Sequence, residues 1–217
     1  MTYPSHWEAD VLTADGARVH LRPITAADAD RLTRFHATLS LRTRYRRYFN
    51  AMPYLSEQAL FRFTNVDYHY RVALIVLVDD EIVAVGRYEG AAGSAEAEVA
   101  FVVADAYQGH GLGSVLLDHL AAAALECGIT RFTATVLADN HGMLRVFTDA
   151  GYQVSSRFRG GEVDLWFEIA DTQRIVAVRA DRAARSAGRS QLTRRPDMPP
   201  STARIEPVVE PDNGLAR

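Results

Sequence analysis

Three glycines at alternate positions make the stretch Gln108-Gly-His-Gly-Leu-Gly-Ser114 a candidate ligand-binding loop. Glycine lets a backbone pass close to a bulky ligand, and the free amides at the start of a helix bind anions. Two carboxylates, Glu96 and Glu98, lie in the Val- and Phe-rich run that leads to this loop. A proton acceptor close to an anion site indicates chemistry on a phosphate-bearing cosubstrate.

The loop does not fit other common phosphate-binding patterns. A Walker A loop ends in Gly-Lys-Ser/Thr, and all 24 basic residues of this chain are arginines. The missing lysine also excludes a lysine nucleophile or Schiff base. A Rossmann fingerprint needs two residues between its last glycines, whereas Gly111-Leu112-Gly113 has one. A plain turn is the simplest alternative, and the apolar run before the loop argues against it.

The loop Gln108–Gly113 resembles the acyl-CoA pyrophosphate loop of the GNAT N-acetyltransferases, whose pattern is Q/R-x-x-G-x-G/A. A second segment, Leu137–Tyr152, is similar to the strand-Asn-helix-Gly-aromatic segment of that superfamily. Three more stretches, Ala97–Gly109, Val19–Ile24 and Arg44–Phe49, resemble the bacterial Pat-type protein lysine acetyltransferases. The resemblance covers roughly residues 17 to 170.

The resemblance implies that Glu98 is the general base. An amine must be neutral to attack a thioester, and at pH 7.4 only about one lysine side chain in a thousand is neutral. A carboxylate at the site lowers that cost by accepting the proton. Glu96 is the reserve candidate. Alternatively, both glutamates lie on one solvated face of a strand, because they are two residues apart.

The resemblance also implies how acetyl-CoA is bound. A bulge in the strand would free a backbone amide near Val103 for the thioester carbonyl, and the main chain of the loop would hold the pyrophosphate. Asn140 would lie beside the cofactor and also suits a helix N-cap. The implied cofactor-binding residues are Phe101, Val102, Val103, Gln108, Gly109, His110, Gly111, Leu112, Gly113, Ser114 and Asn140.

Two positions need separate comment. His110 is interpreted as a solvated loop residue rather than a catalytic one. Phe147 stands where many GNAT enzymes carry a tyrosine that protonates the leaving thiolate, so a side-chain acid is in doubt. Charged and aromatic residues fall where acceptors usually approach, although a solvated helix face explains the arginines equally well; they are Arg44, Tyr45, Arg46, Arg47, Asp67, Tyr68 and His69.

Composition sets wider bounds. With 217 residues, 48% of them hydrophobic, the chain suits one domain with a substantial core. A net charge of −3 argues against nucleic-acid binding. The single cysteine, Cys127, excludes an intrachain disulfide, and the histidines lack metal-ligand spacing, so we expect no metal. We find no signal peptide and no apolar run long enough for a membrane span, and expect a cytoplasmic protein that binds no membrane.

The resemblance implies an α/β (α+β) fold, with a mixed, mostly antiparallel sheet that splays at the acyl-CoA site and is flanked by helices. Periodicity predicts strands over 17–22, 72–78, 82–86, 96–103, 131–137, 152–158 and 163–169, and helices over 26–39, 40–49, 56–63, 112–127 and 141–150. We expect an N-terminal extension over 1–16, the acetyltransferase domain over 17–170, an Arg- and Ala-rich helix over 171–189 and a disordered Pro-rich tail over 190–217.

The leading interpretation is an enzyme that transfers acetyl from acetyl-CoA to a protein lysine, with an acyl-CoA synthetase among the expected acceptors. An acetyltransferase acting on small amines would share the same cofactor site. A non-catalytic acyl-CoA sensor or subunit is the alternative from a different class. Glu98 favours an enzyme, whereas Phe147, which cannot act as an acid, is compatible with the non-catalytic sensor.

Overall fold

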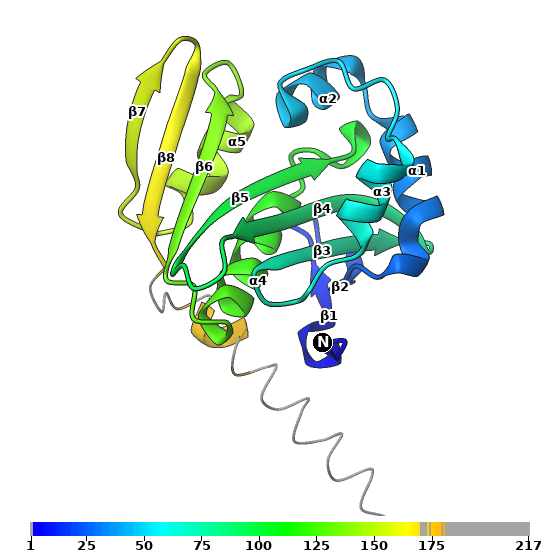
Figure 1. The fold of residues 1–217 in the computed structure, drawn as a ribbon, viewed down its shortest axis with the longest axis horizontal. Coiled ribbons are helices and arrows are strands. Elements are labelled where there is room, and N and C mark those ends of the chain that lie inside the picture. The colour runs from blue at the N-terminus through cyan, green and yellow to red at the C-terminus, as the bar shows by residue number, and fades with distance from the viewer. Residues whose placement is uncertain (1, 170–172, 174, 179, 181–217) are drawn as a thin grey trace, which may run out of the picture.

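Eight strands form one open, mixed sheet in the order β1-β2-β3-β4-β5-β6-β8-β7 (Figure 1). The computed structural model describes residues 2–169, 173, 175–178 and 180. Neighbouring strands are antiparallel except β5 and β6, which run parallel. The strands are β1 (Ala9–Leu12), β2 (Arg18–Pro23), β3 (Arg71–Val78), β4 (Glu81–Gly90), β5 (Glu96–Val103), β6 (Arg131–Leu137), β7 (Ser155–Arg159) and β8 (Glu162–Glu168).

Helices cover both faces of this sheet (Figure 1). The α-helices are α1 (Ala29–Thr38), α2 (Leu41–Tyr48), α3 (Glu57–Thr64), α4 (Leu112–Glu126) and α5 (His141–Thr148), and short 3-10 turns span Ser5–Trp7, Ala26–Asp28 and Asp105–Tyr107. The longest, α4, packs its leucines and alanines on one face of β3, β4 and β5. Residues of α1 pack on the other face, so the sheet is buried on both sides. Burial on both sides explains why β3 reads as a continuous apolar run, Val72–Val78.

The sheet opens between β5 and β6. These strands pair only from Glu96 to Glu98, opposite Arg131 to Thr133. Beyond that point β5 continues to Val103 beside β4, while β6 continues beside β8, and the two diverge as in Figure 1. The predicted fold class, including the splay, is confirmed.

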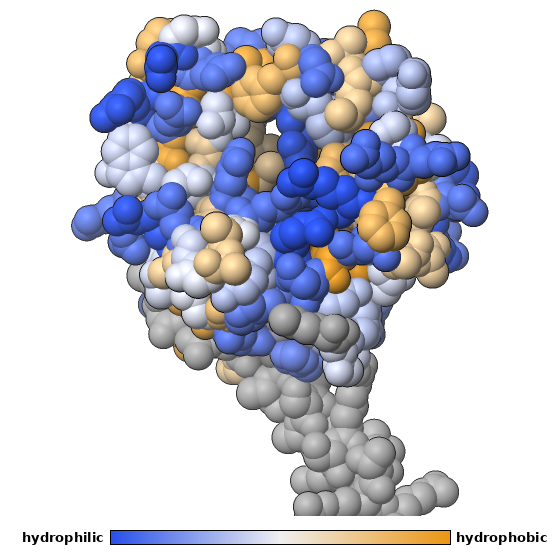
Figure 2. All heavy atoms as spheres, viewed as in Figure 1, coloured by the Kyte–Doolittle hydropathy of each residue, from blue (hydrophilic) through white to orange (hydrophobic). Residues whose placement is uncertain are grey.

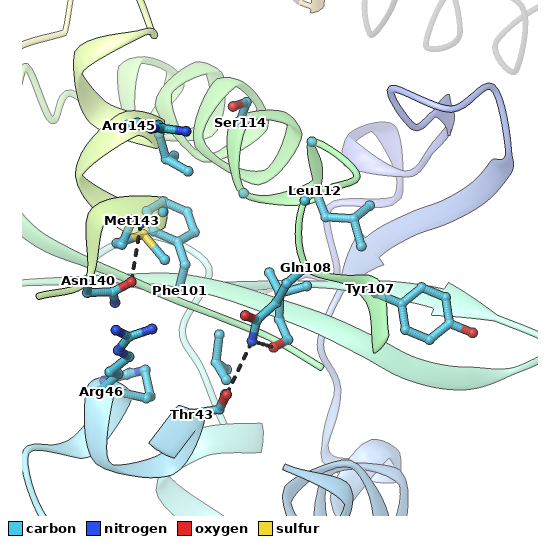
Figure 3. A pocket seen from close by; sticks show the side chains of 18 residues that line it. Thr43, Arg46, Phe101, Tyr107, Gln108, Leu112, Ser114, Asn140, Met143 and Arg145 are labelled. Atoms are coloured by element: carbon cyan, nitrogen blue, oxygen red, sulfur yellow. Dashed lines mark hydrogen bonds between the residues drawn. The ribbon is translucent and has the colours of Figure 1, made fainter. Parts of the chain in front are cut away.

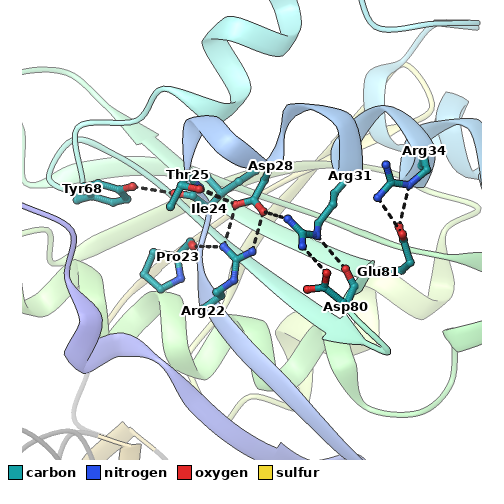
Figure 4. Close-up of polar contacts among 10 residues, drawn as sticks. All are labelled: Arg22, Pro23, Ile24, Thr25, Asp28, Arg31, Arg34, Tyr68, Asp80 and Glu81. Carbon is teal, nitrogen blue, oxygen red and sulfur yellow. Dashed lines mark hydrogen bonds and ion pairs between the residues drawn. The ribbon is translucent and has the colours of Figure 1, made fainter.

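A buried ionic network fixes the start of α1 to the end of β2 (Figure 4). The Asp28 carboxylate, fully buried, accepts hydrogen bonds from Arg22 at 2.6 and 2.8 Å and from the Thr25 amide at 2.9 Å. Burial acts to raise the pKa of Asp28, but the hydrogen bonds from Arg22 and Thr25 outweigh it and leave that pKa below its ordinary value. Thr25 and Asp28 form the capping box of the 3-10 turn Ala26–Asp28, which leads into α1.

Two parts of the sequence-based description need comment. β1 lies in the segment predicted to be an N-terminal extension and was not predicted, because four residues are too few to show an alternating pattern. It pairs with β2 and so belongs to the sheet. The predicted helix over 171–189 falls mostly outside the described residues, and the tail over 190–217 falls wholly outside them; Ile175, which is described, is buried in the core.

Candidate active site

A cleft of about 290 Å³ lies beside the end of β5, past the point where β5 and β6 diverge (Figure 3). Its walls come from β5, the loop that follows it, the first turn of α4, α5 and α2. Ten of the eleven predicted cofactor-binding residues line it, and His110 is the exception. The lining residues outside the prediction are Thr43, Arg46, Arg47, Tyr107, Gly142, Met143, Arg145 and Val146.

The glycine loop leaves main-chain donors free at the start of α4. Gly109 and Gly111 have φ angles of 85° and 82°, which side chains with a Cβ rarely adopt. The Val115 amide makes the first helical hydrogen bond, to the Gly111 carbonyl at 3.1 Å, so the amides of residues 112–114 have no partner within the helix. The first turn carries no acidic residue. This helix end can therefore bind an anion in the cleft.

The loop is held in place from two sides. The Gln108 side-chain amide donates to the Val103 carbonyl at 3.1 Å and to the Thr43 hydroxyl at 3.2 Å (Figure 3). On the other side, the Ala14 amide donates to the His110 carbonyl at 2.9 Å. The His110 ring lies 2.7 Å from the Asp15 carboxylate. His110 therefore braces the loop through the turn that joins β1 to β2 and points away from the cleft lining.

Asp15 is a residue that the sequence did not single out. Hydrogen bonds from Thr13 and His110 lower its pKa to about 2. Its contact with His110 joins residues 95 positions apart, and no local pattern signals such a pair.

The inner edge of β5 offers free backbone groups without a bulge. The Ala104 amide donates to the Val83 carbonyl at 2.9 Å, which fixes the phase of the β4–β5 ladder. In an antiparallel ladder alternate residues face the neighbouring strand, so the amides of Phe101 and Val103 face the opening. The expected bulge in β5 is wrong, because the pairing with β4 keeps one register from Ala97 to Val103. Divergence from β6 exposes these amides instead.

A small recess of about 40 Å³ adjoins the cleft on the face of β5 that carries Glu98. Glu98 is exposed and makes no hydrogen bond or ion pair with any described residue. Glu96 lies outside this recess and is 3.6 Å from the Arg131 guanidinium. Of the two carboxylates, only Glu98 therefore faces the opening. The cleft and the recess share five lining residues, which are Arg46, Arg47, Phe101, Asn140 and Met143.

Comparison with known proteins agrees with this geometry. The model of the acetyltransferase (GNAT) family matches residues 36–152. The chain belongs to the GNAT acetyltransferase family. The GNAT domain of S. lividans PAT has the same fold with a TM-score of 0.72 and is 46% identical, over 77% of this chain and 99% of that domain.

Two further relatives are acetyltransferases by name. Acetyltransferase PA5475 of Pseudomonas aeruginosa is 32% identical over 64% of this chain and 75% of its own length. Acetyltransferase Pat of Mycolicibacterium smegmatis is 33% identical over 63% of this chain, and the match spans 41% of that protein. The chain is thus a Pat-like GNAT acetyltransferase that matches less than half of the mycobacterial enzyme.

Another wall of the cleft is α5, and the predicted helix over 141–150 agrees with its observed bounds. Asn140 caps this helix, since its side-chain oxygen accepts from the Met143 amide at 3.4 Å. Gly113 is required for close packing of α4 on α5, because a Cβ there would lie 2.8 Å from the Val146 side chain. Phe147 is buried against Phe101 and has no proton to donate.

Three arginines line the site; the sequence interpretation named Arg46 and Arg47 only as residues that an acceptor could approach, and it did not single out Arg145. Arg46 donates to the carbonyl and carboxylate of Asp139 at 2.8 and 3.0 Å, so it ties α2 across the opening to the loop before α5. Arg145 projects from α5 near Ser114 at the start of α4 (Figure 3). Arg47 lines both the cleft and the recess. The run Arg44–Phe49 did not reveal which arginine would face the cleft, and the lone Arg145 gave no spacing signal.

The structure does not gather the remaining suggested acceptor residues here. The Asp67 carboxylate accepts from the amides of His69 and Arg71 within its own turn. The Tyr68 hydroxyl donates to the Ile24 carbonyl, and Arg44 donates to the carbonyls of Leu39 and Pro53. None of these lines the cleft or the recess. Tyr45 is exposed and lines a shallow groove between α2 and the end of β6.

Within the described residues, no cluster of three or more His, Cys, Asp or Glu side chains is arranged to bind a metal ion. No helix in that part of the chain has the length and apolar character needed to cross a membrane.

Proposed function

We propose that the protein transfers the acetyl group of acetyl-CoA to the side-chain amine of a protein lysine, with Glu98 as general base. The observation that carries this proposal is the junction of two spaces. A cleft with an anion-binding end meets a recess with an unpaired carboxylate at the point where β5 leaves β6. A thioester in the cleft would reach this junction, and an amine in the recess would meet it there.

Acetyl-CoA suits the cleft. Its pyrophosphate matches the free amides at the start of α4, which the Gly111 conformation turns toward the cleft. Its acyl arm matches the opening along β5, where the amides of Phe101 and Val103 can donate to the thioester carbonyl. We therefore assign the cofactor role to the residues that line the cleft, and to His110 the support of the loop.

The chemistry follows from the same groups. Glu98, directly or through a water molecule, accepts the proton of the lysine ammonium. The neutral nitrogen attacks the thioester carbon, a C–N bond forms, and the carbonyl oxygen gains negative charge opposite the β5 amides. The C–S bond then breaks, sulfur leaves with its electron pair, and the nitrogen releases its second proton to solvent, from which the thiolate is protonated after it leaves the site. The products are the acetylated amine and CoA.

A protein acceptor is favoured by the shape of the entrance. Figure 2 shows the surface hollowed between α2 and the β6–β8 side, with hydrophilic residues gathered below the hollow over β4 and β5. A shallow groove with the exposed Tyr45 on its rim leads along α2 and the end of β6. The Pat-like relatives are consistent with a lysine acceptor, and an acyl-CoA synthetase is the acceptor that we propose to test first. Because acetyl-CoA and acyl-CoA synthetases occur together in the cytoplasm, we propose that the reaction takes place there.

A small amine is the second candidate acceptor, because the recess itself is small. The buried Phe147 supports a third reading, a non-catalytic acyl-CoA sensor, since it cannot act as an acid.

One experiment separates these functions. The purified protein is incubated with radiolabelled acetyl-CoA and either a purified acyl-CoA synthetase or a pool of small amines. We expect label on the synthetase, at lysine, as determined by mass spectrometry. Label on the small amines alone would replace the proposed acceptor. Binding of acetyl-CoA without transfer to any acceptor would favour the sensor.

A further inference from the structure

The proposed reaction leaves one charge unaccounted for. Sulfur leaves as a thiolate, and the buried Phe147 offers it no proton. The five residues that line both cleft and recess surround the point where the C–S bond would break. Of these five, only Arg46, Arg47 and Asn140 carry polar side chains.

Two of the three polar side chains are already engaged. Arg46 donates two hydrogen bonds to Asp139, both from one guanidinium nitrogen. This contact joins α2 to the loop before α5. Asn140 accepts from the Met143 amide as the N-cap of α5. Moving either group toward sulfur would break a contact that shapes the cleft.

Arg47 is different. No hydrogen bond or salt bridge engages its guanidinium within the described part of the chain, and the group lies over the Tyr48 ring, 5.1 Å from the ring centroid. Burial lowers its pKa, against the attraction of Glu98 on β5 and Glu89 on β4. Arg87 on β4 lies close enough to repel it. Arg47 is half-buried, so water screens its charge only in part and it can interact with a new charge nearby.

We propose that Arg47 is a catalytic residue that stabilises the departing CoA thiolate. This inference rests on the proposed function. Before the reaction the negative charge nearest Arg47 in the recess is the Glu98 carboxylate. When Glu98 takes the amine proton that charge disappears, and breaking the C–S bond places an equivalent negative charge on sulfur. Arg47 therefore faces one anion at each stage, and no side-chain acid is needed.

Other cations near the site fit this role less well. Arg87 is buried beside Glu89 with its guanidinium over the Phe63 ring, and it lines neither the cleft nor the recess. Arg145 lines the cleft but not the recess, so it faces the phosphate end of the cosubstrate. Arg42 is exposed, lies 4.0 Å from the Asp139 carboxylate and lines neither the cleft nor the recess.

The test measures the pKa of the CoA thiol when CoA is bound, and it needs no acceptor. Ultraviolet absorbance of the thiolate is followed against pH for CoA in complex with the wild-type protein, Arg47→Met and Arg42→Met. We expect the wild-type complex to lower the pKa of this thiol below that of free CoA. Arg47→Met should raise it by about one pH unit or more, because an opposite charge within a few ångströms shifts a pKa by roughly that amount. Arg42→Met, the matched control on the same helix, should leave it unchanged.

Two more variants sharpen the result. Arg47→Lys keeps a positive charge and should hold the thiol pKa close to the wild-type value. Arg47→Gln, which removes the charge but keeps a polar side chain, replaces Arg47→Met if that variant does not fold and should raise the thiol pKa in the same way. Glu98→Gln mimics the protonated base and should lower the thiol pKa further. An Arg47→Met complex with an unchanged thiol pKa overturns the role of Arg47 alone. A wild-type protein that binds neither CoA nor acetyl-CoA overturns the proposed function, and this inference with it.

Discussion

The cleft and the adjoining recess use different parts of the polypeptide. The cleft offers main-chain groups, namely the amides at the start of α4 and the open edge of β5, and its shape depends on glycine conformations. The recess offers charged side chains, with Glu98 and Arg47 facing each other across it. Cosubstrate binding should therefore tolerate many side-chain changes but few backbone changes. Turnover should instead depend mainly on the side chains of Glu98 and Arg47.

The largest expected effect is on the recess side. Glu98→Gln keeps the size of the side chain but removes the proton acceptor, so turnover on a lysine peptide should fall by roughly 10²–10⁴-fold at pH 7. Affinity for acetyl-CoA, measured by calorimetry, should stay within experimental error because the cleft is untouched. The deficit should shrink as pH rises, since more amine is then neutral.

Glu96→Gln is the matched control. Glu96 lies two residues away on the same strand face and outside the recess, near Arg131. Its replacement should change turnover little. If this variant is inactive and Glu98→Gln is active, the base is assigned to the wrong carboxylate.

The next effect is on the cleft side. Gly111→Val places a β-branched residue at a φ of 82°, which costs roughly 1–3 kcal/mol and distorts the loop. Acetyl-CoA affinity should fall by at least about tenfold, with circular dichroism unchanged. Gly93→Val introduces the same change at a φ of 78° in the turn before β5, at the end of that strand away from the loop. Equal loss of affinity in both variants would show general destabilisation rather than a damaged binding loop.

Arg145→Met tests whether the cleft depends on its backbone alone. Arg145 is the exposed cation near the start of α4. Its loss should weaken acetyl-CoA binding by up to about fivefold, because an exposed ion pair contributes up to roughly 1 kcal/mol. The difference from wild type should disappear at high salt. Acetyl-dephospho-CoA, which lacks the 3′-phosphate but keeps the pyrophosphate, shows which of these groups Arg145 contacts. If Arg145 contacts the 3′-phosphate, the wild-type protein and Arg145→Met should bind this analogue equally.

The smallest expected effect is a loss of folding stability at acidic pH. His36 on α1 is buried beside Tyr48 of α2, the ring centroids 5.7 Å apart, and burial and the nearby Arg44 lower its pKa below 6.5. The folded state thus binds a proton less readily than the unfolded state. Stability should be unaffected above pH 6.5 and decline as pH falls below it.

Calorimetric melting between pH 7.5 and pH 5.5 checks this, with His36→Leu as the control that should lose less stability. Because α2 carries Arg46 and Arg47, acid should impair turnover before it impairs acetyl-CoA binding. A wild-type melting temperature that falls no more than that of the variant would contradict the assignment.

Most residues that line the main-chain side of the candidate cleft could be named from the sequence. Glycines and helix caps act locally, so Gly109, Gly111 and Asn140 could be placed from neighbouring residues alone. The order of strands and helices followed from periodicity, and its resemblance to GNAT enzymes supplied the splay.

The side-chain half could not be predicted in the same way. Arg47 acts through its distance from Glu98, and the two meet only after α2 packs against β5. The pairs Asp15–His110 and Arg46–Asp139 join residues 95 and 93 positions apart. The expected bulge failed for a related reason. Whether an amide of β5 is free depends on its neighbours β4 and β6, and its own residues do not reveal their register.

The turn between β1 and β2 reaches the cofactor loop from a part of the chain that the family model does not include, since the match begins at residue 36. Asp15 and Ala14 thus support the glycine loop from outside the segment that the family model matches. Natural variation in this turn could alter how firmly the loop is held without changing any residue of that segment. Such a turn is a suitable place for evolution, or an engineer, to adjust affinity for the cosubstrate separately from the chemistry.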